Sequence, residues 1–419
     1  MIQAVKGTRD ILPAESGKWQ FAEAAARRVF RRYGFREIRT PVFESTELFA
    51  RGIGEGTDIV SKEMYTFRDR GERSLTLRPE NTAPVVRAAI EHGLFQRADS
   101  ERLYYIGPMF RYERPQKGRM RQFHQIGVEA FGSVEPAVDA EVIEMSTTFL
   151  AQLGIADSDL IINSVGCAIC RPAYKERLRA FLLPRVAELC PDCQRRLHDN
   201  PLRILDCKAG CRALLSDAPT LLESLDAGCR EHFDGLRRCL DLLEVRHRVD
   251  PHLVRGLDYY VRTTFEILGA SLGAQNALLG GGRYDRLVED LGGPSIPGVG
   301  FASGLDRLVL SLPAGAPAAA AEGPDFFVAL QGRLAFDRAF RLTRDLRRLD
   351  LWVEMDPRSD PSLKAQTRRA DQLGARRILF LGDDEIRRGV VAMKKMADGS
   401  QRELPLDDLA QLAREAAVE

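Results

Sequence analysis

The feature that most constrains the fold of this chain is an alanine-, proline- and glycine-rich segment, PAGAPAAAAEGP, at residues 313–324. It has no hydrophobic periodicity, and such a composition is typical of a linker. A chain of 419 residues is long enough for two or three domains that each bury a core of their own. We therefore expect one folding unit over residues 1–312 and a second over residues 325–419.

The two parts differ in their hydrophobic patterns. Before the linker, an amphipathic helix expected at residues 18–33 precedes short runs of alternating polarity, which favour a mostly antiparallel sheet with one working face. The runs are MYTFRD, SLTLRP, RLYYIGPMFRYE, FHQIGVEAFG, DYYVRTTFEIL and GVGFASGL. After the linker, buried strand runs alternate with helical patterns, which predicts a small α/β domain with a largely parallel sheet. The predicted class of the whole chain is α+β.

A helical insertion is expected at about residues 165–248, and the region around it holds all eight cysteines. Six of them form closely spaced pairs: Cys167 and Cys170, Cys190 and Cys193, and Cys207 and Cys211. Their spacing fits a structural zinc site with four cysteine ligands. Free buried thiols explain the same residues in a reducing compartment. The sequence leaves both alternatives open.

The bulk composition describes a soluble protein. Net formal charge is +1, so contact with a nucleic acid would need a local cluster of cations. The N-terminal MIQAVKGTRDILP lacks the apolar core of a signal peptide, and no uncharged apolar run of 18 residues occurs. Together with cysteines in a large chain, these features favour the reducing cytoplasm and no membrane contact.

The stretch from Arg111 to Gly132, RYERPQKGRMRQFHQIGVEAFG, joins a basic loop to a strand pattern. In a strand, residues two apart share a face, so Gln125 and Glu129 are expected to point together. A guanidinium at Arg111 is suited to hold a phosphate through two parallel hydrogen bonds. The alternative is a solvated charged hairpin, which is what an isolated run of charges usually forms.

Two further segments place polar residues at turns. Glu80, Asn81 and Thr82 form a polar corner that can bind an ammonium group or cap the helix that follows. For this segment taken alone, capping is the better explanation. Arg255 precedes Gly256, a residue at which the backbone can approach a ligand closely.

The remaining candidates are weaker when each is taken alone. Tyr259 and Tyr260 are adjacent in an expected strand, so one should lie in the core while the other faces a cleft. The triplet Gly280–Gly282 leaves space against a flat or charged ligand. Arg307 opens a helix after a glycine-rich strand, where a surface or capping role is more common than phosphate binding.

Two nucleotide-binding motifs are absent from the sequence. The chain contains no G-x-x-x-x-G-K-[ST], and no G-x-G-x-x-G follows a strand pattern. If the protein handles nucleotide phosphates, arginines must hold them. This requirement suits Arg111, Arg255 and Arg307.

These stretches, in this order, resemble the histidyl-tRNA synthetases, a family of class II aminoacyl-tRNA synthetases. The resemblance runs from KGTRDILP at residues 6–13 into the C-terminal part of the chain. Pro41 stands where the first class-defining motif has its proline, residues 111–132 resemble the second motif, and GFASGLDRLVL resembles the third. RGLDYY and GGRYD resemble signatures specific to histidyl enzymes. The implied fold is an antiparallel class II sheet flanked by helices, with a helical insertion and a small α/β anticodon-binding domain.

The resemblance implies that histidine and ATP form histidyl-adenylate and pyrophosphate, and that the histidyl group then passes to the 3′ end of tRNA-His. Arg111 and Arg255 would grip the α-phosphate and the carboxylate from two sides. Arg307, the third catalytic arginine, would hold the tail of ATP together with Mg²⁺, and Glu113 would also contact ATP. The implied histidine-binding residues are Glu80, Asn81, Thr82, Arg111, Gln125, Glu129, Arg255, Tyr259 and Tyr260.

Within this set, the resemblance assigns the two ends of the amino acid to different side chains. Glu80 and Thr82 would bind the ammonium group, with Gln125 alongside. Glu129 and one of the two tyrosines would bind the imidazole nitrogens, since a carboxylate and a phenol suit a ring with two distinct nitrogens. A site that requires both hydrogen bonds rejects amino acids that lack them.

Contacts with tRNA-His are implied in two places. Gln116 and Arg121 of the basic loop would read the acceptor end. The C-terminal domain would bind the anticodon, and its nearly balanced charge means that the contacts must be local. Its candidate cations are Arg368, Arg369, Arg376, Arg377, Lys394 and Lys395. The family also implies a homodimer with the first motif at the interface.

Two positions depart from the family pattern. Asn81 stands where the family commonly has glycine, and because asparagine tolerates unusual backbone angles we expect the site to be retained. Asp306 replaces the usual glutamate before Arg307, and its shorter reach bears on contacts with metal or ATP. The alternative to an enzyme is the non-catalytic regulatory subunit of ATP phosphoribosyltransferase. Such relatives usually lack the anticodon domain and parts of the arginine and tyrosine signatures, both of which this chain keeps.

Overall fold

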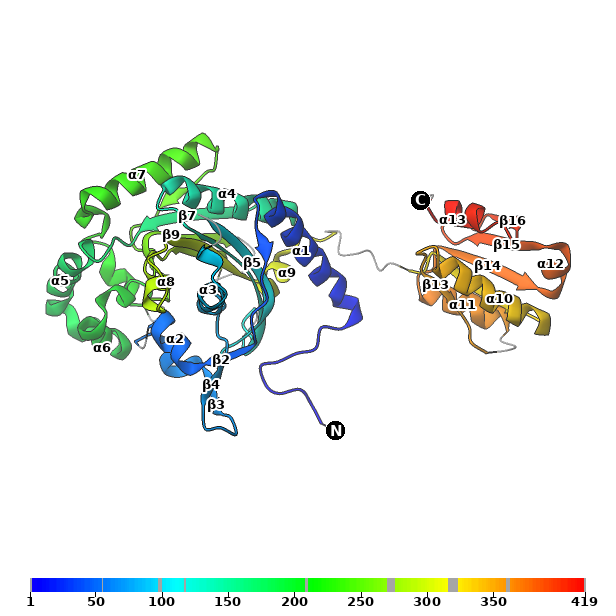
Figure 1. Ribbon diagram of the computed structural model, residues 1–419, viewed down its shortest axis with the longest axis horizontal. Coiled ribbons are helices and arrows are strands. Elements are labelled where there is room, and N and C mark those ends of the chain that lie inside the picture. The colour runs from blue at the N-terminus through cyan, green and yellow to red at the C-terminus, as the bar shows by residue number, and fades with distance from the viewer. Residues whose placement is uncertain are drawn as a thin grey trace. The chain divides into compact units, whose positions relative to one another are not determined.

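The computed structural model describes residues 2–54, 56–96, 100–116, 118–207, 210–269, 276–315, 323–358 and 362–417. The chain forms two compact units, Met1–Pro317 and Ala318–Glu419, which are described separately (Figure 1). Most of the expected linker, residues 316–322, lies outside the described residues. No helix in the described part of the chain is long and apolar enough to cross a bilayer.

The first unit is built on an eight-stranded sheet in the order β1-β5-β6-β11-β10-β9-β7-β8. The outermost pairs, β1–β5 and β7–β8, are parallel, and all other neighbours are antiparallel, as predicted. The strands are β1 Arg36–Glu37, β5 Glu101–Phe110, β6 Gln122–Phe131, β7 Ser158–Ser164, β8 Arg248–Val249, β9 Val261–Gly269, β10 Ala277–Arg283 and β11 Gly298–Gly304.

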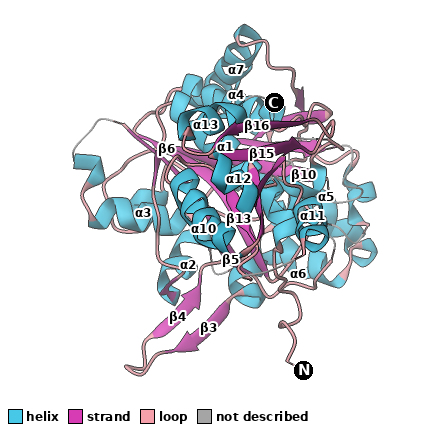
Figure 2. Ribbon diagram, turned by 90° about the vertical axis from the view of Figure 1, so that its right-hand side faces the viewer, coloured by secondary structure: helices cyan, strands magenta, loops and turns pink. Residues whose placement is uncertain are grey.

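A smaller sheet, in the order β2-β4-β3, lies at the edge of this unit. Its strands are β2 Phe43–Ser45, β3 Tyr65–Arg68 and β4 Ser74–Leu77. The β3–β4 hairpin projects away from the large sheet (Figures 1 and 2).

Helices cover both faces of the large sheet (Figure 1). They are α1 Pro13–Arg32, α2 Thr46–Ile53, α3 Thr82–Glu91, α4 Pro136–Gln152, α5 Cys170–Leu182, α6 Pro191–Asp199, α7 Ala227–Leu242, α8 Leu287–Asp290 and α9 Leu305–Ser311. Between β7 and β8 the described residues form helices and no strand. In that insertion, α5, α6 and α7 alternate with short 3-10 turns, among them Pro201–Ile204 and Cys211–Leu215.

The alternation of side chains along β6 separates the two faces. Ile126 and Val128 enter the apolar core beneath α1, α4, α7 and α9. Phe131 enters the opposite core, which includes residues of α3, α5, α6 and α8. Because residues two apart share a face, Gln125 and Glu129 lie on this second side of the sheet, as the strand pattern predicted.

Helix α1 illustrates why the apolar pattern predicted this element, although the helix begins at Pro13, before the predicted start at residue 18. Trp19, Ala22, Val29 and Phe30 are buried along one side, and this spacing matches the period of an amphipathic helix. Gly34 follows the helix with φ +79°, a left-handed conformation that ends many helices. The helix therefore stops where the sequence indicated.

The second unit contains a five-stranded sheet in the order β13-β12-β14-β15-β16. β12 pairs in parallel with β13 and β14, as the alternation of strands and helices predicted. The prediction of a largely parallel sheet is wrong for β15 and β16, which are antiparallel. A short turn joins these two strands, and without a crossover helix they can only run antiparallel.

The elements of the second unit are β12 Phe326–Gln331, α10 Arg333–Arg347, β13 Val353–Met355, α11 Leu363–Gln372, β14 Arg377–Gly382, α12 Asp383–Arg388, β15 Val390–Lys395, β16 Gln401–Pro405 and α13 Leu409–Ala417.

A buried ion pair ties the large sheet to α4. Arg283, at the end of β10, donates from Nε and Nη2 to the carboxylate of Asp139, and neither side chain is exposed. Its Nη1 donates to the Ser133 carbonyl at 2.8 Å and to Asp285 at 2.9 Å. A buried charge of this kind is tolerated because its polar atoms have partners.

Breaking this pair should destabilise the first unit. In Asp139→Asn the charged guanidinium stays buried beside a neutral amide, so the free energy of unfolding should fall by about 3–5 kcal/mol. The control Asp159→Asn breaks an ion pair with Arg248 in which both side chains are 52% exposed, and its effect should stay within about 1 kcal/mol. Urea unfolding followed by circular dichroism measures both variants. Equally small changes would contradict the role assigned to Arg283.

Candidate active site

A cleft of about 750 Å³ opens on the side of the large sheet that carries Gln125. Its walls come from the basic loop between β5 and β6, the start of α9, the segment before β9 and residues 203–207 of the helical insertion. The cleft is lined by the three arginines expected to be catalytic, Arg111, Arg255 and Arg307, together with Gln125 and Glu113. Five of the predicted site residues are therefore brought to one cavity.

Arg111 is held mainly by uncharged partners. Its Nε donates to the Pro79 carbonyl at 2.8 Å, and its guanidinium carbon lies 5.4 Å from the centre of the Phe123 ring. The ion pair with Glu113 is long, with 3.9 Å between Nη1 and Oε1. Such partners orient the guanidinium without neutralising it, which leaves it able to bind an anion in the cleft.

Arg307, in the first turn of α9, contacts backbone carbonyls. Its Nη1 donates to Ala277 at 2.8 Å and its Nε donates to Gly118 at 3.3 Å. Across the described residues, no carboxylate lies within ion-pair distance of it. Burial lowers the pKa of this guanidinium, and neighbouring cations, of which Arg119 acts most strongly, lower it further. A bound anion would supply the missing counter-charge.

Arg255 has a carboxylate partner, and its guanidinium lies in the space left by a glycine. Its Nη1 donates to Oε1 of Glu266 on β9. A Cβ atom at Gly280 would lie only 2.5 Å from Nη1, so a larger residue there would displace the guanidinium. The space that the glycine triplet leaves is thus occupied at Gly280 by an arginine of the protein.

Gln125 presents an unsatisfied acceptor to the cleft. Its side chain is buried, and among the described residues its Oε1 has no hydrogen-bond donor. A buried polar atom without a partner costs free energy. A donor carried by a ligand, such as an ammonium group, would remove that cost.

Four residues farther along β6, Glu129 is enclosed by hydroxyl groups. Thr82 Oγ1 donates to its Oε1 at 2.8 Å, and the Tyr284 hydroxyl donates to its Oε2. Glu80 accepts from the backbone N–H groups of Thr82 at 2.7 Å and Ala83 at 3.0 Å. Glu80 therefore caps α3, which is the better explanation of that segment taken alone.

Both buried glutamates have altered pKa values. Burial raises the pKa of Glu129 to about 8, despite the hydrogen bonds from Tyr284 and Thr82 that lower it. Burial also raises the pKa of Glu80, and the backbone N–H groups of Ala83 and Thr82 act against the shift. Glu129 therefore holds its proton to a higher pH than an ordinary glutamate does.

The two adjacent tyrosines do not lie on opposite strand faces, so this prediction is wrong. β9 begins only at Val261, and Tyr259 and Tyr260 occupy the turn before it. Their ring centres are 4.7 Å apart. Tyr260 lines a smaller cavity of about 170 Å³ that also contacts Arg255. Both rings therefore pack in one cluster beside the cleft.

Asn81 does not line the cleft. Its Oδ1 accepts from Thr40 Oγ1 at 2.7 Å and from Arg78 Nη1 at 3.2 Å, and its φ of −123° is ordinary. The tolerance of asparagine for unusual backbone angles is therefore not needed at this position. Asp306 does line the cleft, where its Oδ2 accepts from the backbone N–H of His124 at 3.0 Å and fixes the start of α9 against β6.

The basic loop places its two candidate tRNA contacts differently. Gln116 is exposed at the tip, where its backbone pairs with Arg119 at 3.0 and 2.9 Å. Arg121 is half-buried at the base, with its guanidinium 3.9 Å from the centre of the Tyr112 ring and its Nε donating to the Glu113 carbonyl at 3.3 Å. The Glu113 carboxylate accepts from Arg119 at 2.8 Å.

A sequence model described as Histidyl-tRNA synthetase matches residues 7–308. The chain belongs to this family. A histidine–tRNA ligase of Pelobacter propionicus is 53% identical over 414 residues, covering 98% of this chain and 99% of the relative. The histidine–tRNA ligase of Trichlorobacter lovleyi is 51% identical over 407 residues, with 97% and 96% covered.

The structure agrees with this membership of the histidyl-tRNA synthetase family. The crystal structure of apo Staphylococcus aureus histidyl-tRNA synthetase matches with a TM-score of 0.83 and 37% identity, covering 99% of this chain and 100% of that one. A model described as Anticodon binding domain matches residues 325–416, which form most of the second unit. The predicted fold class is therefore confirmed.

Sequence reasoning missed two partners of the predicted residues. Tyr284, which donates to Glu129, belongs to GGRYD, a stretch that resembles a signature of histidyl-tRNA synthetases, so the signal was present. Glu266, the partner of Arg255, is the only acid in the strand run TTFEILG. A single acidic residue in an otherwise uncharged strand indicates that its side chain faces a polar site.

The raised pKa of Glu129 predicts a pH dependence of stability. The folded protein holds a proton that the unfolded chain releases above the ordinary glutamate pKa, so stability should fall as pH rises towards about 8 and then level off. Glu129→Gln cannot titrate, so its stability relative to the wild type should increase with pH between 5 and about 8. Urea unfolding midpoints measure this difference. A difference that does not change with pH would contradict protonation of Glu129.

Proposed function

We propose that this member of the histidyl-tRNA synthetase family is a ligase that activates L-histidine with ATP and transfers the histidyl group to the 3′ end of tRNA-His. The observation that carries the proposal is the convergence of Arg111, Arg255 and Arg307 on one cleft beside the unpaired acceptor of Gln125. Each arginine comes from a different segment of the first unit. Together they supply positive charge where a carboxylate and a triphosphate must meet.

In the activation step, the histidine carboxylate attacks the α-phosphorus of ATP, and the bond to the β-phosphate breaks. Negative charge accumulates on the α-phosphate, so catalysis requires positioning and electrostatic stabilisation rather than a nucleophile from the protein. Arg111 and Arg255 hold the α-phosphate and the carboxylate. Arg307 holds the tail of ATP.

Mg²⁺ enters with ATP as part of the substrate. Three of the carboxylates that line the cleft already have partners: Glu113 contacts Arg119, Glu266 contacts Arg255, and Asp306 contacts the His124 amide. Among the described residues, the acids that line the cleft do not form a group close enough to hold an ion, because both groups that meet this criterion are built on cysteines. This arrangement suits an ion held mainly by triphosphate oxygens, with Glu113 near the phosphates.

The imidazole of histidine binds at Glu129, and the ammonium group binds near Gln125, Glu80 and Thr82. Glu129 is buried, so the side chains around it must move to admit the ring. A protonated Glu129 donates to an unprotonated imidazole nitrogen, and its anion accepts from an N–H group. Binding at this residue explains how one amino acid is selected by hydrogen bonds.

The two units bind opposite ends of tRNA-His in this proposal. The exposed tip of the basic loop, with Gln116, contacts the acceptor end, and Arg121 orients the base of the loop. The second unit binds the anticodon. Its exposed candidates are Arg368, Arg369 and Arg376, with Lys394 and Lys395 half-buried. Arg377 is buried in β14, with its guanidinium 5.9 Å from the centre of the Phe326 ring, so it is better explained as part of the core.

The active form is a homodimer in the cytoplasm. Val42 and Phe43, directly after Pro41 of the first motif, are exposed, as is Phe67 on the neighbouring hairpin. The rings of Phe43 and Phe67 lie 6.5 Å apart. An exposed apolar patch of this kind is characteristic of a protein interface and supports the dimer that the family implies.

The regulatory-subunit alternative is disfavoured by two features of the chain. The relatives that cover nearly its whole length at about half identity are named histidine–tRNA ligases, and the second unit matches the anticodon-binding family. A protein without catalytic function would need neither three arginines in the cleft nor an anticodon domain.

Histidine-dependent exchange of pyrophosphate into ATP tests the proposed activity. The purified chain should exchange with histidine and not with glutamine or phenylalanine. Arg255→Ala should reduce exchange by at least about 10²–10³-fold, because one donor to the developing charge is lost. Arg248→Ala, an exposed arginine on β8, is the matched control. No exchange by the wild type, or full exchange by Arg255→Ala with an unchanged melting temperature, would contradict the assigned chemistry.

The role of the loop tip is tested by separating the two steps. Gln116→Ala should lower kcat/KM for charging tRNA-His by about tenfold, the equivalent of one lost hydrogen bond to a charged group. Pyrophosphate exchange should remain within about twofold of the wild type, since Gln116 does not line the cleft. Gln152→Ala, an exposed glutamine at the end of α4, is the control. Equal losses in both assays would exclude a specific role in tRNA binding.

A further inference from the structure

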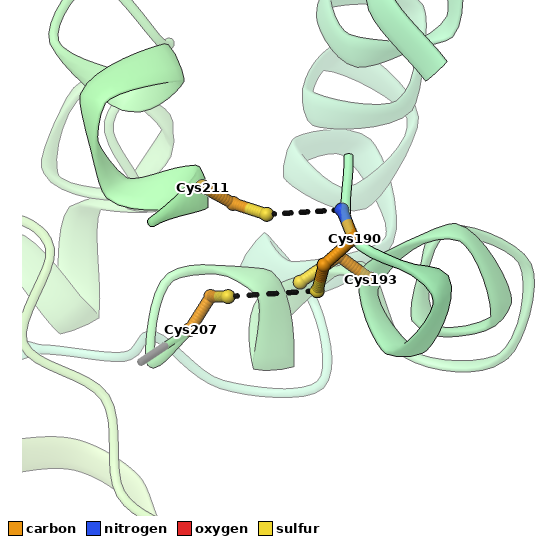
Figure 3. Close-up of side chains that lie close together, drawn as sticks. All are labelled: Cys190, Cys193, Cys207 and Cys211. Carbon is orange, nitrogen blue, oxygen red and sulfur yellow. Dashed lines mark hydrogen bonds between the residues drawn. The ribbon is translucent and has the colours of Figure 1, made fainter. Parts of the chain in front are cut away.

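Four cysteines of the helical insertion converge on one point (Figure 3). Cys190 and Cys193 lie at the start of α6, Cys207 follows the 3-10 turn Pro201–Ile204, and Cys211 begins the next turn. All four sulfur atoms lie within 4.8 Å of one another. Three of the side chains are buried, and Cys190 is partly buried.

The distances suit a shared metal ion better than a disulfide. Cys190 Sγ and Cys207 Sγ are 3.8 Å apart, far beyond the ~2.05 Å of a disulfide bond. With a zinc–sulfur bond of about 2.3 Å, the edge of a ZnS₄ tetrahedron is about 3.8 Å. We propose that Cys190, Cys193, Cys207 and Cys211 bind one Zn²⁺ ion as a closed structural site.

The backbone around the cluster fixes the positions of the sulfur atoms. The backbone N–H of Cys190 donates to Cys211 Sγ at 3.3 Å, and Cys190 and Cys193 occupy the N-cap position and the first turn of α6. Four protein ligands complete the tetrahedron, so the ion has no open position for catalysis.

A second cysteine cluster in the insertion provides a contrast. Cys167 and Cys170 each donate to Asp226 Oδ2 at 3.0 Å. The other carboxylate oxygen accepts from the backbone of Cys229 at 2.8 Å and caps α7. With Cys229, this cluster also has its ligand atoms within 4.8 Å of one another, but one of them is a carboxylate oxygen that already accepts from two thiols. The sequence spacing left open which pairs meet, and the structure places Cys167 and Cys170 in a different cluster from Cys190 and Cys193.

The proposed ion would position a wall of the active-site cleft. Leu205, Asp206 and Cys207 line that cleft together with Arg203. Arg203 Nη1 donates to the carbonyl of Arg255 at 3.3 Å. A metal that fastens Cys207 to the start of α6 would hold this segment against the backbone of a proposed catalytic arginine. The site thus acts through position and takes no part in the chemistry.

Elemental analysis of the purified full-length chain tests the zinc site without reference to activity. Mass spectrometry of metals should find one zinc per chain that Cys193→Ser loses. Cys239→Ser, a partly buried cysteine of α7 outside both clusters, should retain it. Absence of zinc from the wild type, or a zinc content that Cys193→Ser leaves unchanged, would overturn the proposal.

Two measurements on the wild type cover the case in which Cys193→Ser fails to fold. Cobalt exchanged into the protein should give the intense visible absorption and the sulfur-to-metal charge-transfer bands of tetrahedral four-thiolate coordination. Removal of zinc by a chelator should increase hydrogen exchange over residues 190–207 and leave residues 325–416 unchanged. A cobalt spectrum without thiolate bands, or unchanged exchange after the ion is removed, would overturn the site or its positioning role.

Discussion

The period of two along β6 is the constraint on which the rest of the first unit depends. Ile126 and Val128 must face the core under α1, α4 and α9, so Gln125 and Glu129 are forced onto the opposite side. A slip of one residue would bury the amide and the carboxylate in an apolar core. The same alternation that stabilises the sheet therefore builds a polar floor beside the cleft.

The electrostatics of that cleft follow from how the arginines are held. Arg111 and Arg307 are fixed mainly by backbone carbonyls, which orient a guanidinium but leave its charge unbalanced. Arg255 differs, because Glu266 neutralises it until a ligand competes for its donors. In the free protein the unpaired positive charges are electrostatically unfavourable, and a bound anion lowers this free energy. In this sense the substrate completes the site.

Much of this architecture was predictable from the order of apolar and polar residues, because buried side chains recur at a regular spacing along a strand or a helix. Helix α1 and strands β5, β6 and β11 follow that rule. Strand β10 was missed because Gly280–Gly282 weaken the strand signal, and the close contacts that require these glycines come from distant segments of the chain. The turn at Tyr259 and Tyr260 could not be separated from β9 by sequence, since both residues favour strands. The grouping of the cysteines required tertiary structure, because sequence spacing does not determine which pairs meet.

The central claim is that the cleft and the polar group around Glu129 form one site for a histidyl-adenylate. Isothermal titration with histidyl-sulfamoyladenosine, a stable mimic of that intermediate, tests it most directly. The account predicts saturable binding at one site per chain, and binding of the phenylalanyl mimic weaker by about 10⁴-fold, because that ring cannot satisfy the buried hydrogen-bonding groups. Equal affinity for the two mimics, or no binding of the histidyl form, would contradict it.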